Sequence, residues 1–257
     1  MKKFQILFQF EVLFFAVYDA FFGEKVRSRV RNIFGSKMRV HPHAVTCPES
    51  MRVFAHIVKK YTTIKPRNVF EIGANFAQDA EGLRHYFGLA DENVWVFEAH
   101  PDMCREIEKM YKFNCINGGV FNKQDTMTFN AVDLGCASNN GLSSLKGRIY
   151  RKDFMRKITV DTFRMDDFMR ENNIDGIDFL KIDVEGANYE VLEGFGDRLK
   201  DIKALHIECE HKLSWDDQKL YVDNKKLLVD NGFEKVFFQR RKNQSDSFWV
   251  RREYIKI

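Results

Sequence analysis

An acidic residue stands at the end of a short apolar segment, just before a glycine that turns the chain toward a helix. The segment is Val69–Ile72, its one acid is Glu71, and Gly73 follows directly. Glycine lets the backbone approach a ligand closely, and the helix after such a turn offers unpaired N–H groups. Open α/β sheets bind nucleotides here, beyond the carboxyl ends of their strands. The turn therefore predicts a nucleotide-like ligand, with a purely structural turn as the alternative.

The residues of this turn argue against a dinucleotide. Asn75 and Gln78 occupy the places of the second and third Gly in the fingerprint GxGxxG. Tight approach of a pyrophosphate is therefore disfavoured, and an NAD-dependent oxidoreductase is not expected. A carboxylate before the turn also repels a pyrophosphate and attracts a cation. The turn thus favours a cationic ligand.

A second acid, Glu98, ends the next predicted strand, residues 94–97. Doubly wound sheets bind the ribose of a nucleotide at this position, because a carboxylate accepts hydrogen bonds from both hydroxyls of a diol. The alternative role for Glu98 is to complement the dipole of the helix predicted to follow it.

Charged and apolar residues are mixed in residues 177–187 in a way that a plain core strand does not show. Lys181, Asp183 and Glu185 alternate along the chain, so an extended backbone directs all three to one side. Buried charges are costly without partners. We therefore expect a functional cluster beside the ligand, with a structural ion-pair network as the alternative.

The strand predicted at residues 204–208 continues this alternation. His206, Glu208 and Glu210 alternate with apolar residues, and His211 lies just beyond. A single histidine is more often structural than catalytic, so His211 is the secondary candidate for a catalytic role.

Short β-branched or aromatic runs alternate with helical periodicity beyond residue 42, and this alternation predicts βαβ units around a mostly parallel sheet. The predicted strands are residues 68–72, 94–97, 115–117, 179–182, 204–208, 235–239 and 247–250. The predicted helices are residues 49–61, 79–87, 101–111, 166–172, 189–193 and 217–231. The last two strands are too close in sequence for a helical crossover, so they are predicted to be antiparallel. Segments 127–132 and 157–162 are predicted to pair as extra strands.

Composition and charge exclude several classes of protein and several kinds of site. The chain has 257 residues, 44% of them hydrophobic, and 5 Cys without a CxxC pair. This composition excludes disorder, and it disfavours a zinc site or a disulfide framework, so a reducing compartment is expected. The excess positive charge lies within residues 1–43, and the remainder is nearly neutral. A nucleic-acid partner is therefore not expected.

The N-terminal segment is a separate feature. Residues 4–22 are mostly apolar, with seven Phe, but Gln5, Gln9, Glu11 and Asp19 interrupt the run. Three interpretations stay open: a helix packed on the body or on a partner subunit, a helix on a membrane surface supported by the basic stretch 25–39, or a membrane span. Peripheral membrane contact would thus involve residues 4–39.

Five ordered segments together resemble one family. The segments are Glu-Ile-Gly-Ala-Asn at 71–75, Phe-Glu-Ala-His-Pro at 97–101, Ser-Ser-Leu at 143–145, residues 160–167, and Phe-Leu-Lys-Ile-Asp-Val-Glu-Gly-Ala at 179–187. They resemble the FkbM-type S-adenosylmethionine-dependent methyltransferases. The resemblance covers about residues 66–252.

This resemblance implies an α/β fold of the class I methyltransferases, doubly wound and Rossmann-like, with a seven-stranded sheet whose last strand is antiparallel. Residues 46–257 are then the methyltransferase domain, and residues 1–45 an N-terminal helical extension. Glu71, Gly73 and Asn75 are expected at the methionine end of the cofactor, and Glu98 at its ribose. Asp183 is expected near the amino group or the reacting methyl.

One departure from the family pattern concerns the first turn. Ala77 stands where the family usually has Gly. The added methyl group is expected to crowd the loop.

The family chemistry implied is O-methylation of a hydroxyl, often on a sugar, glycan or glycolipid. A general base near the methyl group is expected, with Asp183 or Glu185 as the candidates and His211 next. A divalent ion held by Asp183 and a neighbouring acid is the alternative way to activate the hydroxyl. A catalytically silent cofactor-binding or scaffold protein of the same fold is the alternative function. The expected location is the cytoplasm, with or without peripheral membrane contact.

Overall fold

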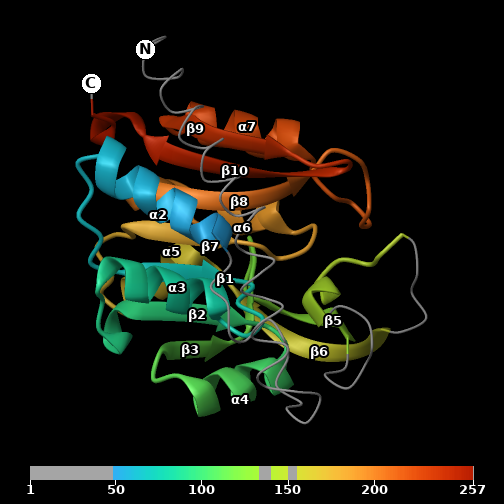
Figure 1. Ribbon diagram of the computed structural model, residues 1–257. Coiled ribbons are helices and arrows are strands. Elements are labelled where there is room, and N and C mark those ends of the chain that lie inside the picture. Colours follow the sequence, from blue (N-terminus) through green and yellow to red (C-terminus); the bar gives the residue numbers. More distant parts are fainter. Residues whose placement is uncertain (1–48, 133–139, 150–154, 257) are drawn as a thin grey trace, which may run out of the picture.

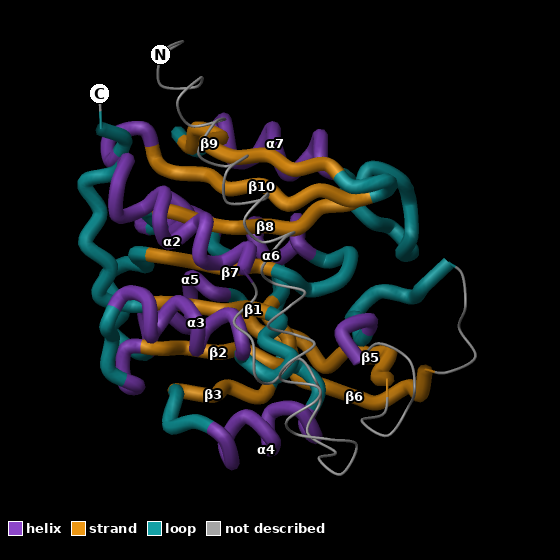
Figure 2. Tube along the Cα trace, in the orientation of Figure 1, coloured by secondary structure: helices purple, strands orange, loops and turns teal. Residues whose placement is uncertain are grey.

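The computed structural model describes residues 49–132, 140–149 and 155–256 of the chain. Seven strands form one sheet in the order β3-β2-β1-β7-β8-β10-β9 (Figures 1 and 2). Its strands are β1 (Val69–Ile72), β2 (Val94–Glu98), β3 (Asn114–Asn117), β7 (Phe179–Ile182), β8 (Ala204–Glu210), β9 (Phe233–Arg240) and β10 (Gln244–Arg251). β10 is antiparallel to both neighbours, and the other pairs are parallel. The predicted sheet, with its antiparallel last strand, is confirmed.

Helices cover both faces of this sheet. They are α2 (Glu49–Tyr61), α3 (Gln78–Phe87), α4 (Pro101–Met110), α5 (Met165–Glu171), α6 (Asn188–Gly194) and α7 (Tyr221–Asp230), with short 3-10 turns η1 (Asp91–Asn93), η2 (Asn140–Leu142), η3 (Gly196–Asp201) and η4 (Arg252–Tyr254). In Figure 1 α2 and α3 lie on the near face and α5 on the far face. The predicted doubly wound α/β architecture is therefore present.

The period of two along the central strands explains the two layers. Phe70 and Leu180 pack into the core with α5, α6 and α7, while their neighbours Val69 and Phe179 pack with α2 and α3. Every residue of β1 and β7 is buried. Strands buried on both faces read as apolar runs, as expected in a parallel sheet covered by helices.

A smaller sheet has the order β4-β6-β5. Its strands are β4 (Gly119–Val120), β5 (Asp125–Val132) and β6 (Met155–Phe163). β5 and β6 pair with each other, as predicted, and their pairing is antiparallel. Figure 1 shows this sheet beside the end of the main sheet toward which β1 runs. β4 has no counterpart in the sequence prediction, because two residues carry no alternation.

One helix boundary differs from the prediction by more than one residue. α7 begins at Tyr221, and the preceding residues form a loop in which Asp217 has a left-handed backbone with φ of 50°. The Gln218 side chain accepts a hydrogen bond from the Ser214 amide at 2.9 Å, and the Lys146 ammonium donates to the Asp217 carbonyl at 2.6 Å. These two contacts stabilise a loop where the first turn of the helix was predicted.

The chain order reverses at the middle of the sheet, where β1 lies between β2 and β7. Such a switch point leaves a crevice beyond the carboxyl ends of the strands. The backbone amide of Asp183 donates to the Ile72 carbonyl at 3.0 Å, and that of Gly73 donates to the Phe97 carbonyl at 3.0 Å. The ends of β1, β2 and β7 are thus held together at this crevice.

We expect Gly73→Ala to destabilise the fold. A Cβ at this position would lie 1.9 Å from the Asp183 carbonyl oxygen, and φ is +80°. The left-handed backbone and the overlap together cost about 2–5 kcal/mol. Urea denaturation of the variant and the wild type measures this loss.

Gly88→Ala is the matched control. Gly88 also has a positive φ, +70°, but no atom lies within 4 Å of its added Cβ. Only the backbone cost of about 1–2 kcal/mol is expected there. Equal losses in the two variants would show that the contact between Gly73 and β7 is not what constrains the turn.

Candidate active site

The turn between β1 and α3 carries an unusual run of left-handed residues. Gly73, Asn75 and Ala77 have φ values of 80°, 53° and 55°. Ala77 is the N-cap of α3 and is wholly buried. An L-residue in this conformation is disfavoured by about 1–2 kcal/mol, which gives a physical reason for the glycine of the family pattern. The fold accepts the alanine, but the backbone around it is strained.

Glu98 connects this turn to the end of β2. One carboxylate oxygen accepts the Asn75 amide at 2.7 Å, and the other accepts the His100 amide at 2.8 Å. Glu98 is buried, and this desolvation raises the pKa of its carboxyl to about 7 despite the two hydrogen bonds. Each oxygen keeps a second lone pair that can accept from a hydroxyl.

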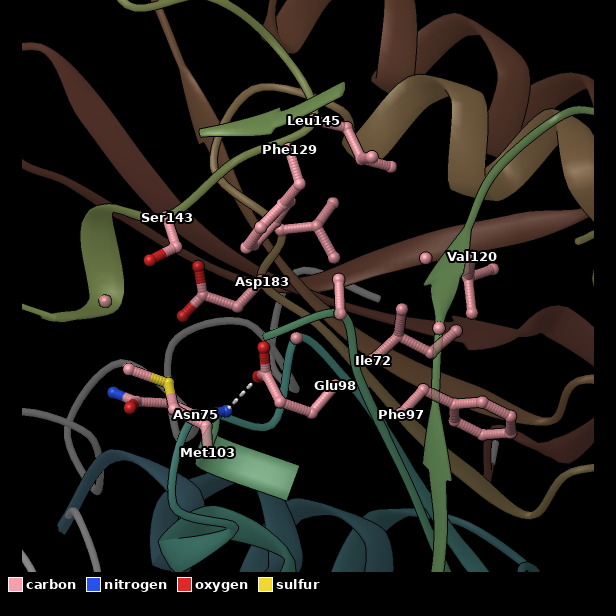
Figure 3. A pocket seen from close by; sticks show the side chains of 16 residues that line it. Ile72, Asn75, Phe97, Glu98, Met103, Val120, Phe129, Ser143, Leu145 and Asp183 are labelled. Atoms are coloured by element: carbon pink, nitrogen blue, oxygen red, sulfur yellow. Dashed lines mark hydrogen bonds between the residues drawn. The ribbon is translucent and has the colours of Figure 1, made fainter. Parts of the chain in front are cut away.

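A pocket lies at the switch point of the sheet, where the turn, Glu98 and the end of β7 meet (Figure 3). Its polar lining includes Asn75, Glu98, Ser143 and Asp183. The rest of the lining is mainly apolar or glycine: Ile72, Gly73, Phe97, Ala99, Met103, Gly118, Gly119, Val120, Phe129, Gly141, Leu145 and Val184. An apolar cavity with a few convergent polar groups is the usual form of a small-molecule site.

The pocket brings together four of the predicted cofactor-binding residues, namely Gly73, Asn75, Glu98 and Asp183. Glu71 is not among the lining residues. It is 1% exposed, and its carboxylate accepts from the Lys181 ammonium at 2.9 Å and from the Ala80 amide at 2.9 Å. The structure therefore places Glu71 behind the pocket, as part of an ion-pair network.

Lys181 is the centre of that network. Its ammonium lies 2.5 Å from Asp79, 2.9 Å from Glu71 and 3.6 Å from Asp183. These carboxylates raise the pKa of Lys181 well above its usual value, so the lysine stays charged although it is buried. Burial raises the pKa of Glu71 to about 7, with Asp79 adding to the rise and Lys181 opposing it. The structural ion-pair network, the alternative interpretation of the charged run, is thus present, and it ends at the pocket residue Asp183.

Acidic residues continue from Asp183 onto the next strand. Burial, together with repulsion from Asp183, raises the pKa of Glu185 well above its usual value and that of Glu208 to about 8. Glu210 also has a raised pKa, chiefly through burial, and accepts from the Trp215 indole at 3.2 Å. Among the described residues no group of three His, Cys, Asp or Glu side chains is arranged to hold a metal ion.

His211 directly follows Glu210, the last residue of β8. Its ring packs on Tyr221 and Phe238, with centroid distances of 5.0 and 6.2 Å. Burial lowers the pKa of His211. The residue does not line the pocket, so the structure does not bring it to the other predicted site residues.

Several pocket residues were not singled out as site residues from the sequence. The small sheet supplies Val120 and Phe129, and α4 supplies Met103. Ser143 and Leu145 lie in a segment that carries the family resemblance, which was the available signal for them. Val120, Phe129 and Met103 come from segments whose residue types and spacing indicate no chemistry, so only the fold identifies them as pocket residues.

The family model described as methyltransferase FkbM domain matches residues 71–238, which is more than half of the chain. The protein therefore belongs to the FkbM methyltransferase family, as the sequence predicted. The search of curated proteins finds no match.

Solved structures with similar folds include methyltransferase FkbM from Methylobacillus flagellatus KT. The TM-score is 0.46 at 12% identity over 72% of this chain and 44% of that chain, so the present chain spans less than half of the FkbM structure. Magnesium protoporphyrin IX methyltransferase from Synechocystis PCC 6803 with bound S-adenosylmethionine gives 0.42 at 15% identity, over 92% and 96%. Fibrillarin from Aeropyrum pernix with the same cofactor gives 0.41 at 11%, over 72% and 66%.

Two earlier expectations concern regions outside the pocket. Among the described residues no helix combines the length and the apolar character needed to cross a bilayer. The N-terminal extension, residues 1–45, lies outside the described residues, so its three interpretations and the domain boundary at residue 46 stay predictions.

We expect Lys181→Met to destabilise the protein strongly. The substitution leaves Glu71 and Asp79 buried without their cation, and breaking a buried ion pair from one side typically costs about 3–5 kcal/mol. Chemical denaturation at pH 8, above the pKa of about 7 of the Glu71 carboxyl, measures the loss.

Lys109→Met is the control, because Lys109 pairs with Glu106 on the surface, where the lysine side chain is 67% exposed. Surface pairs contribute about 0–1 kcal/mol. A similar small loss in both variants would mean that the Lys181 network does not hold the ends of β1 and β7 together.

Proposed function

We propose that the chain is an S-adenosylmethionine-dependent O-methyltransferase whose acceptor is a hydroxyl of a sugar, glycan or glycolipid. The pocket that joins Gly73, Asn75, Glu98 and Asp183 at the switch point of the sheet carries this proposal. Membership in the FkbM family supplies the class of reaction. The sugar-type acceptor follows from the resemblance of the motif segments to that family.

The residues of the pocket fit the cofactor. Glu98 is the proposed acceptor for the ribose hydroxyls, and the hydrogen bonds from the Asn75 and His100 amides, which align its oxygens, support this role. The side-chain oxygen Oδ1 of Asn75 is buried and has no hydrogen-bond partner among the described residues. This oxygen is an acceptor suited to the ammonium group of the methionine part.

The charge of the surroundings supports the same assignment. Asp183 lines the pocket, and the three acids around Lys181 outnumber their lysine. An excess of carboxylates favours a cation over an anion. A sulfonium with an ammonium group nearby meets this requirement, and a pyrophosphate does not.

Methyl transfer to oxygen is an in-line displacement, and the cofactor supplies the electrophilic methyl group when bound. The protein must hold the acceptor oxygen about 3–3.5 Å from that carbon. A carboxylate that removes the hydroxyl proton contributes roughly 10²–10⁴-fold. Asp183 is the favoured base because its side chain is 34% exposed and lines the pocket. Glu185 is less suited, since it does not line the pocket and burial raises its pKa well above the usual value.

A catalytically silent cofactor-binding protein is the second candidate. The strained Ala77 at the first turn favours it, because the family pattern has glycine there. Release of S-adenosylhomocysteine in the presence of an acceptor distinguishes the enzyme from the silent protein. Cytoplasmic location, with or without peripheral membrane contact through residues 4–39, and the lack of a nucleic-acid partner belong to the same proposal.

Binding of S-adenosylmethionine is expected to weaken as the pH falls from 8 to 6. The pKa of Glu98 is about 7, so at pH 8 the group is an anion that accepts from two hydroxyls, and at pH 6 it is mostly protonated. Titration calorimetry at the two pH values measures the change. Glu98→Gln should bind about 10–100-fold more weakly at pH 8, as the loss of hydrogen bonds to a charged group predicts.

The control is the pH dependence of the Glu98→Gln variant, which should be much weaker. An unchanged pH dependence in that variant would assign the titration to another group. The absence of binding heat in the wild type at pH 8 would remove the proposed function.

Asp183→Asn is expected to lower turnover about 10²–10⁴-fold while the chain still binds S-adenosylmethionine. The assay supplies the cofactor with a panel of free sugars, oligosaccharides and glycolipids and measures S-adenosylhomocysteine. Asp197→Asn is the control, because Asp197 is exposed on η3 and does not line the pocket. Full turnover by Asp183→Asn would exclude Asp183 as the base.

A further inference from the structure

Two cysteines outside the proposed chemistry meet between α4 and β3. The sulfur atoms of Cys104 and Cys115 lie 2.9 Å apart. Cys104 is 2% exposed on the inner side of α4, and Cys115 is half-buried on β3. Cys209, the other cysteine among the described residues, is buried on β8. The contact is therefore a specific pair and not a general clustering of thiols.

We propose that Cys104 and Cys115 form a reversible disulfide when the protein meets a peroxide. The bonded distance between two sulfur atoms is about 2.0 Å, so the two sulfur atoms, now 2.9 Å apart, need to approach by about 0.9 Å. They come from a helix and a strand that are already packed together through Ile107 and half-buried Cys115. No rearrangement of the fold is required to bring them together.

The local electrostatics assign the two sulfur atoms different roles. The contact with Cys115 lowers the pKa of Cys104, and the same contact raises the pKa of Cys115. The thiolate is the reactive form of cysteine. In this proposal Cys104 is the thiol that reacts first, and Cys115 is the resolving thiol.

The chemistry balances with hydrogen peroxide as the oxidant. The Cys104 thiolate attacks one peroxide oxygen, the O–O bond breaks, and the products are a sulfenic acid and hydroxide. The Cys115 sulfur then attacks the Cys104 sulfur, the S–O bond breaks, and the sulfenic oxygen leaves as water with the Cys115 proton. The two sulfur atoms are oxidised, and the peroxide is reduced to water. A dithiol reductant reverses the bond by thiol–disulfide exchange.

This pair lies directly beside the proposed cofactor pocket. Met103, the neighbour of Cys104 on α4, lines the pocket. Cys115 pairs in register with Val96 of β2, and Asn117 on the same strand donates to the Glu98 carbonyl at 2.8 Å. The disulfide would join the α4 wall of the pocket to the edge strand β3. The site is thus placed to make that wall respond to oxidation.

The test uses the full chain with Cys47→Ser and Cys136→Ser, which leaves Cys104, Cys115 and Cys209 as the thiols. The reduced protein is treated with hydrogen peroxide, alkylated under denaturing conditions and digested without reductant. We expect the titratable thiols to fall from three to one, and mass spectrometry to find the peptides of Cys104 and Cys115 joined. Dithiothreitol should restore all three.

Two further variants in this background control the assignment. Cys209→Ser should keep the linked peptides, whereas Cys115→Ser should lose them and leave Cys104 as a sulfenic acid that dimedone traps. Mapping of the unsubstituted chain gives the same answer should a variant not fold. The proposal is overturned when Cys104 and Cys115 are both alkylated after peroxide treatment of folded protein. None of these readouts requires cofactor binding or turnover, so they are independent of the proposed function.

Discussion

The buried ammonium of Lys181 is the interaction on which the rest of the site depends. It lies within 3 Å of two carboxylates, Glu71 from β1 and Asp79 from α3, and reaches toward Asp183 at the end of its own strand. Three acids at one buried place would repel one another and be expensive to desolvate. With the lysine among them, β1, α3 and β7 can end at the same point, and the pocket forms in front of that point.

The same arrangement gives the pocket its electrostatic character. Glu71 and Asp79 outnumber Lys181 behind the turn, and Asp183 and Glu98 line the pocket at its front. Burial raises the pKa of both Glu71 and Glu98 to about 7, so their charges are sensitive to a ligand that brings a cation. A cavity of this kind is suited to a positively charged nucleoside. The proposed binding site of the methyl donor and the proposed base thus both lie at the carboxyl ends of the same strands.

Sequence patterns predicted the elements better than their tertiary contacts. Helix α2 has the predicted bounds, and β7 was predicted to the residue, because long periodicity and a short apolar run are local properties. The first turn of the helix predicted at 217–231 is absent. In the loop before α7, the Gln218 side chain accepts from the Ser214 amide, and the Lys146 ammonium donates to the Asp217 carbonyl. Ala77 was expected to crowd its loop, and its positive φ gives a different physical reason for the strain.

The sequence by itself determined the family, the doubly wound sheet and most of the acids that gather at its carboxyl edge, since strand-end position and motif order are visible in one dimension. Only the tertiary structure decided which of those acids line the pocket. Glu71, which was expected at the cofactor, accepts from Lys181, a partner 110 residues away, and does not line the pocket, whereas Glu98 and Asp183 line it. The physical reason is that the burial and charge of a carboxylate depend on neighbours from other strands, and no local spacing records them.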